Sequence, residues 1–190
     1  PLQFVKKITF TLQIFLSQTK MIIENKKVVS VNYHLTVKEN DQEVLVEKTD
    51  AEHPFVFLFG AGGLLEGFEN NLKGKKVGDS FDFHIDAENG YGLVDDDSIV
   101  TIPIDAFKAE DGTIDTDMVK VGNTLPMSDN EGNRLQGTVE EITADFVKMD
   151  FNHPLAGQDL RFKGIVLDIR DASAEELAHG HVHGPHGHHH

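Results

Sequence analysis

The densest group of residues suited to chemistry is a set of histidines at the C-terminal end of the chain. There are seven, on a segment that also contains Gly and Pro: His179, His181, His183, His186, His188, His189 and His190. Neutral imidazoles favour late first-row divalent ions such as Ni²⁺, Cu²⁺, Zn²⁺ and Co²⁺. The alternative is that the last three histidines are remnants of an engineered tag. The run from His179 to His186 is unlike a standard tag, so we predict a metal-binding tail.

Other catalytic and cofactor patterns are missing from the sequence. The chain has no Cys, which excludes disulfides, thiolate zinc sites and cysteine nucleophiles. No Ser lies in a nucleophile-elbow context, and residues 60–63 lack the final glycine of a dinucleotide fingerprint. The acidic runs near residues 95–97 and 111–117 miss the calcium-loop spacing, so we expect solvated turns there. His34, His53 and His84 are isolated in sequence and are not expected to be ligands.

The composition is strongly acidic. The chain contains 32 Asp and Glu against 17 Lys and Arg, and its formal charge is −15. Such a surface repels nucleic-acid phosphates and anionic lipid, so we expect neither nucleic acid nor membrane as a partner. The absence of Cys fits a reducing compartment. We expect a cytoplasmic protein. We also expect it to be a monomer.

Residues 1–20 differ from the rest of the chain. Lys6 and Lys7 precede an apolar run that resembles a signal peptide, but no small-residue cleavage site follows. The run is also too short and too polar to span a bilayer. We expect Met21 to be the natural start and residues 1–20 to be an upstream extension outside the fold, with a targeting segment as the alternative.

Apolar spacing in the first half of the chain predicts strands around one short helix. The expected strands cover residues 27–37, 44–46, 54–59 and 81–85, where apolar residues alternate or run together. Leu65, Phe68 and Leu72 have helical spacing, and Gly74 ends that pattern. A last strand is expected over residues 162–169. Residues 171–178 are predicted to form a short helix with Ser173 and Glu176 as a capping box.

The stretch from about residue 98 to residue 150 has a different pattern. It contains several short predicted strands, a hairpin signal at residues 129–132, and extended runs at 138–142 and 146–151. Its core is expected to include Ile102, Ile104, Phe107, Val139, Ile142 and Phe146. A strand-rich chain with one central helix, interrupted before its last strand, predicts an α+β fold.

Five stretches together resemble the SlyD group of FKBP-type peptidyl-prolyl isomerases. They are residues 31–33, residues 58–60 followed by 63–69, residues 89–92, residues 152–157 and residues 175–181. The resemblance implies an antiparallel sheet wrapped on a short helix, formed by residues 21–95 and 151–172. It also implies a β-rich chaperone domain inserted in the flap at residues 96–150. Residues 173–190 would form a short helix and a disordered, His-rich tail that binds Ni²⁺ or a related metal.

The resemblance also implies an aromatic pocket that takes a proline ring. Phe68 would form its floor, Tyr33, Tyr91 and Phe162 its walls, and Leu64 and Leu65 would complete it. Phe57, His153 and Leu155 would line the rim, and Glu47 stands where the family commonly has Asp. The alternative is that these Phe and Leu residues only form part of the hydrophobic core and bind nothing. Both tyrosines of the chain fall at these motif positions.

A pocket of this kind is sufficient for prolyl isomerisation. Amide resonance opposes rotation about the C–N bond with a barrier of about 18–20 kcal/mol, and no bond is broken during the rotation. Neither a nucleophile, a general base nor a cofactor is needed. The expected partners are unfolded or proline-containing polypeptides and, through the metal tail, metalloenzyme-maturation proteins. Two alternatives stay open: a holdase with little turnover, and a metal-homeostasis protein anchored by its folded domains.

Overall fold

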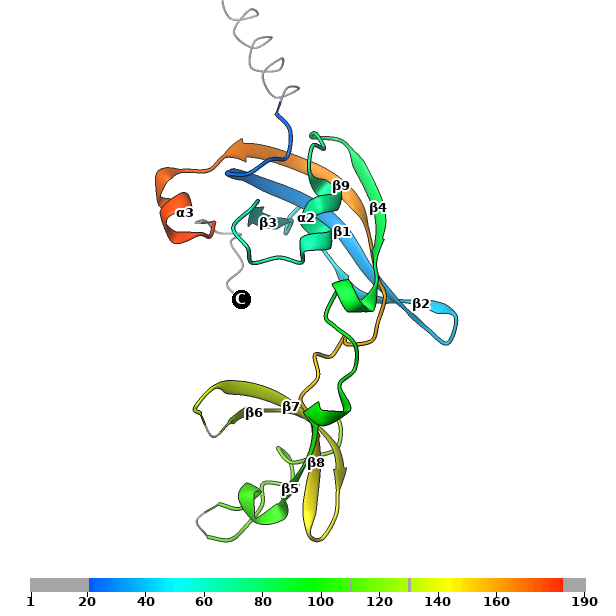
Figure 1. Ribbon diagram of the computed structural model, residues 1–190, viewed down its shortest axis with the longest axis vertical. Helices are drawn as coiled ribbons and strands as arrows, with labels where there is room; N and C mark the ends of the chain where they lie inside the picture. The colour runs from blue at the N-terminus through cyan, green and yellow to red at the C-terminus, as the bar shows by residue number, and fades with distance from the viewer. Residues whose placement is uncertain (1–20, 110, 130, 183–190) are drawn as a thin grey trace, which may run out of the picture. The chain divides into compact units, whose positions relative to one another are not determined.

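The structure is a computed structural model, and it describes residues 21–109, 111–129 and 131–182. These residues form two compact units (Figure 1). The first unit consists of residues 21–90 and 158–182, and the second consists of residues 91–157. The division into an isomerase domain and an inserted chaperone domain, with the boundaries given above, stays a prediction.

An antiparallel sheet forms the body of the first unit. Its strands are β1 (Lys27–Glu39), β2 (Gln42–Lys48), β3 (Phe55–Leu58), β4 (Ser80–Ile85) and β9 (Leu160–Asp171). The order across the sheet is β2-β1-β9-β4, and β3 pairs with the first residues of β1. The predicted strands of this unit are confirmed, and so is the α+β class.

Strand β1 and helix α2 (Glu66–Leu72) bury the core of this unit. The alternation that predicted β1 corresponds to its burial, since Val29, Val31, Tyr33, Leu35 and Val37 are all buried. Helix α2 lies against the sheet and buries Phe68 and Leu72 (Figure 1). The helix ends where predicted, because Gly74 takes a φ of 79°, a left-handed conformation that favours glycine.

The C-terminal helix α3 (Ala174–His179) begins later than predicted. Strand β9 continues to Asp171, which pairs with Lys27 of β1, so the backbone at 171 is extended rather than helical. The predicted capping box is confirmed: the Ser173 hydroxyl accepts from the Glu176 N–H at 3.2 Å, and the Glu176 carboxylate accepts from the Ser173 N–H at 2.8 Å. The rest of the predicted tail, from residue 183 onward, and residues 1–20 lie outside the described residues.

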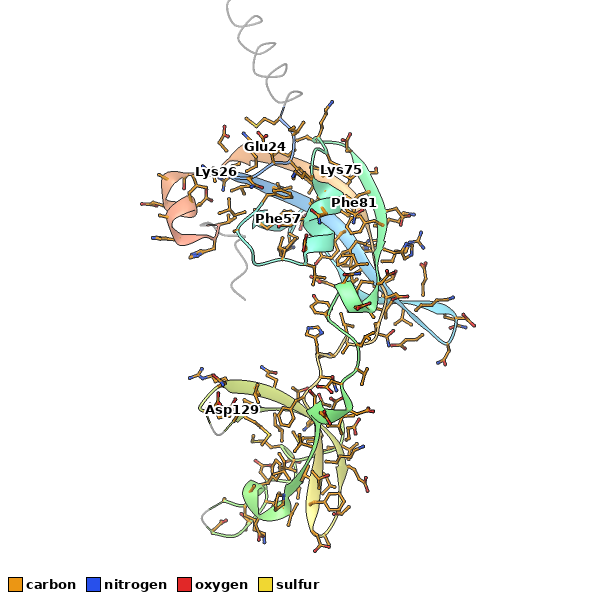
Figure 2. The ribbon with its side chains drawn as sticks, viewed as in Figure 1. Glu24, Lys26, Phe57, Lys75, Phe81 and Asp129 are labelled. Atoms are coloured by element: carbon orange, nitrogen blue, oxygen red, sulfur yellow. The ribbon has the colours of Figure 1, made fainter. Side chains whose placement is uncertain are left out.

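The second unit is a four-stranded antiparallel sheet. Its strands are β5 (Ile99–Pro103), β6 (Thr124–Ser128), β7 (Arg134–Ile142) and β8 (Phe146–Asp150), in the order β5-β8-β7-β6. Two short 3-10 helices, η2 (Asp96–Ser98) and η3 (Ile104–Phe107), flank β5. A third, η1 (Ala87–Asn89), belongs to the first unit and follows β4. The predicted hairpin joins β6 to β7, and Asp129 lies at this turn (Figure 2). Its carboxylate accepts from the N–H of Glu131 and of Asn133.

The core of the second unit differs in part from the predicted one. Its buried residues are Val119, Leu125, Val139, Val147 and Met149, with Ile102, Ile104 and Phe107 among those packed against them. The inclusion of Ile142 was wrong, because Ile142 is the last residue of β7 and 39% of its surface is exposed. Phe146, the first residue of β8, is only half-buried and is not part of the cluster. Strand ends lie at the margin of the sheet, where fewer residues cover them.

In the described part of the chain, no helix has both the length and the apolar character needed to cross a membrane.

Candidate active site

Phe68 is the centre of a cluster of six aromatic side chains in the first unit. Its ring centroid lies 5.0 Å from Phe162, 5.8 Å from Phe57, 5.9 Å from Phe83, 6.1 Å from Tyr33 and 6.3 Å from Phe55. All five pairs are edge-to-face, the arrangement that aromatic rings favour. We call these six residues the Phe68 cluster. Phe57 of β3 lies beside α2 in Figure 2.

The loop before α2 fixes the position of Phe68. The Leu65 carbonyl accepts from the N–H of Phe68 at 3.0 Å and of Glu69 at 3.2 Å, which starts the helix. The Glu69 carboxylate accepts from the Gly60 N–H at 2.7 Å and so ties the loop to the helix. Gly60 has a φ of 81°, and a Cβ there would lie 2.7 Å from the Asn25 side chain, so this position requires glycine.

Tyr33 and Phe162 come from neighbouring strands and point to the same face of the sheet. In the register of β1 with β9, Leu35 is opposite Phe162 and Tyr33 is opposite Gly164. The centroids of Tyr33 and Phe162 are 5.6 Å apart. The backbone of Tyr33 is held on both sides by Thr49: its N–H donates to Thr49 Oγ1 at 2.9 Å, and its carbonyl accepts from the Thr49 N–H at 3.0 Å.

The Phe68 cluster is buried at its centre and partly exposed at its margin. Tyr33, Phe57, Phe68 and Phe162 are buried. Phe55 and Phe83 are half-buried, as are the predicted site residues Leu64 and Leu65 at the start of α2. An apolar group can therefore reach the cluster from this margin.

The remaining predicted site residue of the first unit is Glu47. It is exposed on β2, opposite Leu35 of β1. Its carboxylate makes no hydrogen bond or ion pair with any described residue. The structure therefore shows no interaction between the Glu47 carboxylate and the Phe68 cluster.

Three predicted site residues, Tyr91, His153 and Leu155, belong to the second unit. The rings of Tyr91 and His153 are stacked, with centroids 3.7 Å apart and an interplanar angle of 4°. The Leu155 N–H donates to His153 Nδ1 at 3.1 Å, which requires this nitrogen to carry no proton. Burial lowers the pKa of His153 from its usual value, because desolvation disfavours the charged imidazolium. Both features keep His153 neutral near pH 7.

Sequence reasoning missed two members of the cluster, Phe55 and Phe83. Phe55 lies two residues before Phe57, so the period of two in a strand places both rings on one face, 5.3 Å apart. Phe83 is opposite Phe162 in the register of β4 with β9, and the two rings are 5.6 Å apart. The alternation of Phe81 and Phe83 was visible in the sequence, but the pairing of Phe83 with Phe162 was not.

The chemistry available to the cluster is limited by its composition. It consists of five Phe and one Tyr, so it offers aromatic faces, one phenolic hydroxyl and no group that ionises near pH 7. Over the residues that the structure describes, no group of three or more His, Asp or Glu could hold a metal ion. The cluster can bind an apolar ring and exclude water from it. Its six side chains include no nucleophile, general base or metal ligand of the kinds that hydrolytic or metal-dependent reactions use.

Comparison with known proteins decides the family. Residues 19–113 match the family described as FKBP-type peptidyl-prolyl cis-trans isomerase. The chain is 36% identical over 166 residues to the FKBP-type peptidyl-prolyl cis-trans isomerase SlyD of Haemophilus influenzae, covering 87% of this chain and 82% of that protein. The chain belongs to the FKBP-type peptidyl-prolyl cis-trans isomerase family.

Two further relatives carry the same description. SlyD of Aeromonas hydrophila is 39% identical over 160 residues, covering 84% of this chain and 70% of that protein. SlyD of Escherichia coli (strain K12) is 37% identical over 169 residues, covering 87% and 80%. These findings confirm the predicted SlyD-like membership of this FKBP-type family and the predicted enzyme class, peptidyl-prolyl isomerase.

Proposed function

We propose that the Phe68 cluster is the proline-binding part of the isomerase site and that this protein accelerates proline-limited folding of other chains. The observation that supports the proposal most strongly is the ring of five aromatic side chains around Phe68, whose margin at Phe55 and Phe83 is partly exposed. A pyrrolidine ring is apolar and compact, and aromatic faces hold such a ring without ordering a charged group.

Catalysis would follow from the difference in polarity between the two states of the substrate amide. The planar amide has the larger charge separation, and the twisted transition state has less. A site that excludes water therefore binds the twisted form better relative to the planar form, and that difference lowers the barrier. The uncatalysed exchange of X-Pro bonds takes about 10–100 s at 25 °C, slow enough to limit folding. Tyr33 brings the hydroxyl that could hold a flanking carbonyl of the substrate.

The roles of Glu47, Tyr91, His153 and Leu155 in substrate binding stay part of this proposal. Their assignment rests on the family resemblance. His153 would act as a neutral rim residue, which its lowered pKa and its Nδ1 acceptor role both favour.

For the second unit we propose a chaperone role, in which it binds unfolded polypeptides and raises their concentration near the proline site. Its exposed apolar side chains support this role: Leu93, Val94, Val100, Met118, Val121, Leu135 and Ile142. Apolar side chains exposed to water can bind apolar segments of an unfolded chain, because the contact removes both surfaces from water.

For the C-terminal segment we propose binding of a nickel-type divalent ion. Of its predicted ligands the structure describes His179 and His181, whose rings lie 5.8 Å apart. Imidazole nitrogens are ligands that late first-row divalent ions prefer. The other five, His183, His186, His188, His189 and His190, lie outside the described residues. Delivery of metal to metalloenzyme-maturation proteins would be the further role of this segment.

The deciding experiment measures the rate of a proline-limited protein refolding reaction with residues 21–190. The test variants are Phe68→Ala and Phe162→Ala, and the control is Leu177→Ala, which removes an exposed apolar side chain of α3 outside both the cluster and the second unit. We expect the parent to accelerate refolding and each test variant to lose about tenfold or more in kcat/KM, that is at least about 1.4 kcal/mol of transition-state stabilisation. Circular dichroism must show that the variants stay folded.

Two deletions separate the proposal from its alternatives. Removing residues 96–150 should reduce activity on a protein substrate far more than on a short proline peptide. Removing residues 179–190 should leave isomerase activity intact and abolish Ni²⁺ binding. A well-folded parent that does not accelerate refolding would leave a holdase or a metal-binding protein on an isomerase fold.

A further inference from the structure

A second concave site lies on the first unit, on the face of the sheet opposite the Phe68 cluster. Its cavity volume is about 640 Å³, which is in the range of small-ligand pockets. The lining comes from β1, β4, β9, the last residue of β2 and the segment after it: Asn32, Tyr33, His34, Lys48, Thr49, Asp50, Ala51, Ser80, Phe81, Asp82, Lys163, Gly164 and Ile165. Because Tyr33 and Phe162 point into the cluster, their neighbours His34 and Lys163 point to the other face.

The sheet places the cavity's polar side chains in a cross-strand row. His34 of β1 is opposite Lys163 of β9, and Lys163 is opposite Asp82 of β4. In the next row on the same face, Asn32 is opposite Ile165, which is opposite Ser80. Neighbours in such rows lie within contact distance of one another, so one ligand group can meet several of them.

The wall formed by the segment after β2 is fixed in place. Thr49 is bound to the backbone of Tyr33 on both sides, as described above. The Asn32 amide, in the orientation that satisfies both neighbours, donates to the Asp50 carbonyl at 2.6 Å and accepts from the Ala51 N–H at 3.1 Å. The cavity is thus preformed, which reduces the ordering cost of binding.

The acidic groups of the cavity already have partners. Asp82 accepts from Arg161 Nε at 2.9 Å and from Arg161 Nη2 at 3.0 Å, and this guanidinium holds the pKa of Asp82 below its usual value. Asp50 accepts from the backbone N–H of His53 at 2.7 Å and of Glu52 at 2.9 Å. Lys163 therefore shares Asp82 with Arg161, and the Asp50 carboxylate is bound by backbone N–H groups of its own loop.

The basic side chains of the cavity, in contrast, have few hydrogen-bond or ion-pair partners. The side chains of Lys48 and His34 make no hydrogen bond or ion pair with any residue that the structure describes. The Lys163 ammonium is 3.9 Å from Asp82 Oδ2, beyond hydrogen-bond distance. The cavity therefore presents two ammonium groups together with apolar lining residues that include Ile165, on a chain whose formal charge is −15. Lysines gathered at a preformed cavity on an acidic protein favour an anionic ligand.

We propose that this cavity binds a carboxylate attached to an apolar group, with Lys48 and Lys163 holding the carboxylate and Ile165 and the Gly164 backbone contacting the apolar part. Two sources share this chemistry: the C-terminal residue of a polypeptide, and a free apolar carboxylic acid. Tyr33 lines both sites, but the lysines and the other polar side chains of this cavity lie on the opposite face of the sheet from the Phe68 cluster. The proposal does not depend on the proposed function.

The test is a titration of residues 21–190 with N-acetyl-phenylalanine, followed by NMR and calorimetry. N-acetyl-phenylalanine amide is the matched ligand without the charge. The test variant is Lys48→Gln with Lys163→Gln. The control is Lys38→Gln with Lys148→Gln, which makes the same change in net charge at lysines outside the cavity. We expect the acid to bind, and both the amide and the test variant to weaken binding about tenfold or more. The control should bind like the parent.

Two further ligands identify the source. A short peptide ending in Phe should bind as tightly as the small acid if polypeptide C-termini are the ligand, and its amidated form should not. Binding of the small acid alone would assign the cavity to free carboxylic acids. Equal binding of acid and amide, equal binding by the test variant, or competition by inorganic phosphate as strong as that of the acid would overturn the proposal.

Discussion

The ring of Phe68 on α2 meets the ring of Phe162 on β9 edge-to-face, with centroids 5.0 Å apart and an interplanar angle of 66°. This is the shortest of the five contacts of Phe68, and both residues are buried. The contact joins the one helix of the cluster to the centre of the sheet. It therefore fixes Phe68 against the sheet at the proposed proline site.

We predict energetic coupling between these two rings. In a double-mutant cycle of Phe68→Leu and Phe162→Leu, the coupling in the free energy of unfolding should be about 0.5–1.5 kcal/mol, the usual contribution of an aromatic pair beyond its buried area. Urea unfolding of the four proteins measures it. A cycle of Phe68→Leu with Phe151→Leu, which lies in the second unit, should be additive. Additivity in both cycles would contradict a specific ring contact.

Much of the first unit was predictable because its signals are local. The alternation in β1 and the spacing of Leu65, Phe68 and Leu72 are properties of short segments. The capping box of Ser173 and Glu176 is likewise contained in four residues. Physical rules that act within one strand or one helical turn can be read from the order of residues alone.

The incomplete part of the prediction depends on pairings between distant residues. Phe83 joins the cluster through its register with Phe162, a relation that no local pattern contains. The late start of α3 follows from the pairing of Asp171 with Lys27, across most of the chain. The exposure of Ile142 follows from where β7 ends in its sheet. Local apolar spacing could not determine any of these three.

Gly164 is predicted to tolerate no side chain. A Cβ at this position would lie 2.0 Å from the Asn32 carbonyl oxygen and 2.6 Å from the Phe81 ring. Because the first of these atoms is backbone within the sheet, Gly164→Ala should lower the free energy of unfolding by about 2 kcal/mol or more. Gly63→Ala is the control, since a Cβ at Gly63 meets no atom within 4 Å. Urea unfolding of the two variants should separate them, and a neutral Gly164→Ala would refute the predicted clash.

Tyr91 is predicted to control the pKa of His153. The two rings are stacked, and burial lowers the pKa of His153. Tyr91→Ala exposes one face of the imidazole, so the pKa should rise toward its usual value of about 6.5. An NMR titration of the His153 ring protons measures the change. Leu93→Ala, which removes an exposed apolar side chain nearby in sequence, should leave the pKa where it is in the parent.

The Arg170–Glu176 pair is predicted to make stability depend on pH in the acid range. The buried Glu176 carboxylate accepts from Arg170 at 2.8 Å and 2.6 Å and from the Ser173 N–H at 2.8 Å. The hydrogen bonds from Arg170, aided by that from Ser173, lower the pKa of Glu176 to about 2. In the unfolded chain the group titrates near 4.5. Between these values the folded protein keeps the carboxylate ionised while the unfolded chain binds a proton, so stability falls as the pH falls.

The contribution of Glu176 should therefore be complete above about pH 5 and should disappear as the pH approaches 2. At pH 7, Glu176→Gln should lower the free energy of unfolding by about 1–3 kcal/mol, as expected for a lost hydrogen bond to a charged group. Urea unfolding of the parent and the variant from pH 7 to pH 2.5 measures the gap, which should narrow with acid. Glu175→Gln changes an exposed carboxylate in the same turn of α3 and should have little effect at any pH. A gap that is the same at pH 2.5 and pH 7 would show that Glu176 acts through its shape rather than its charge.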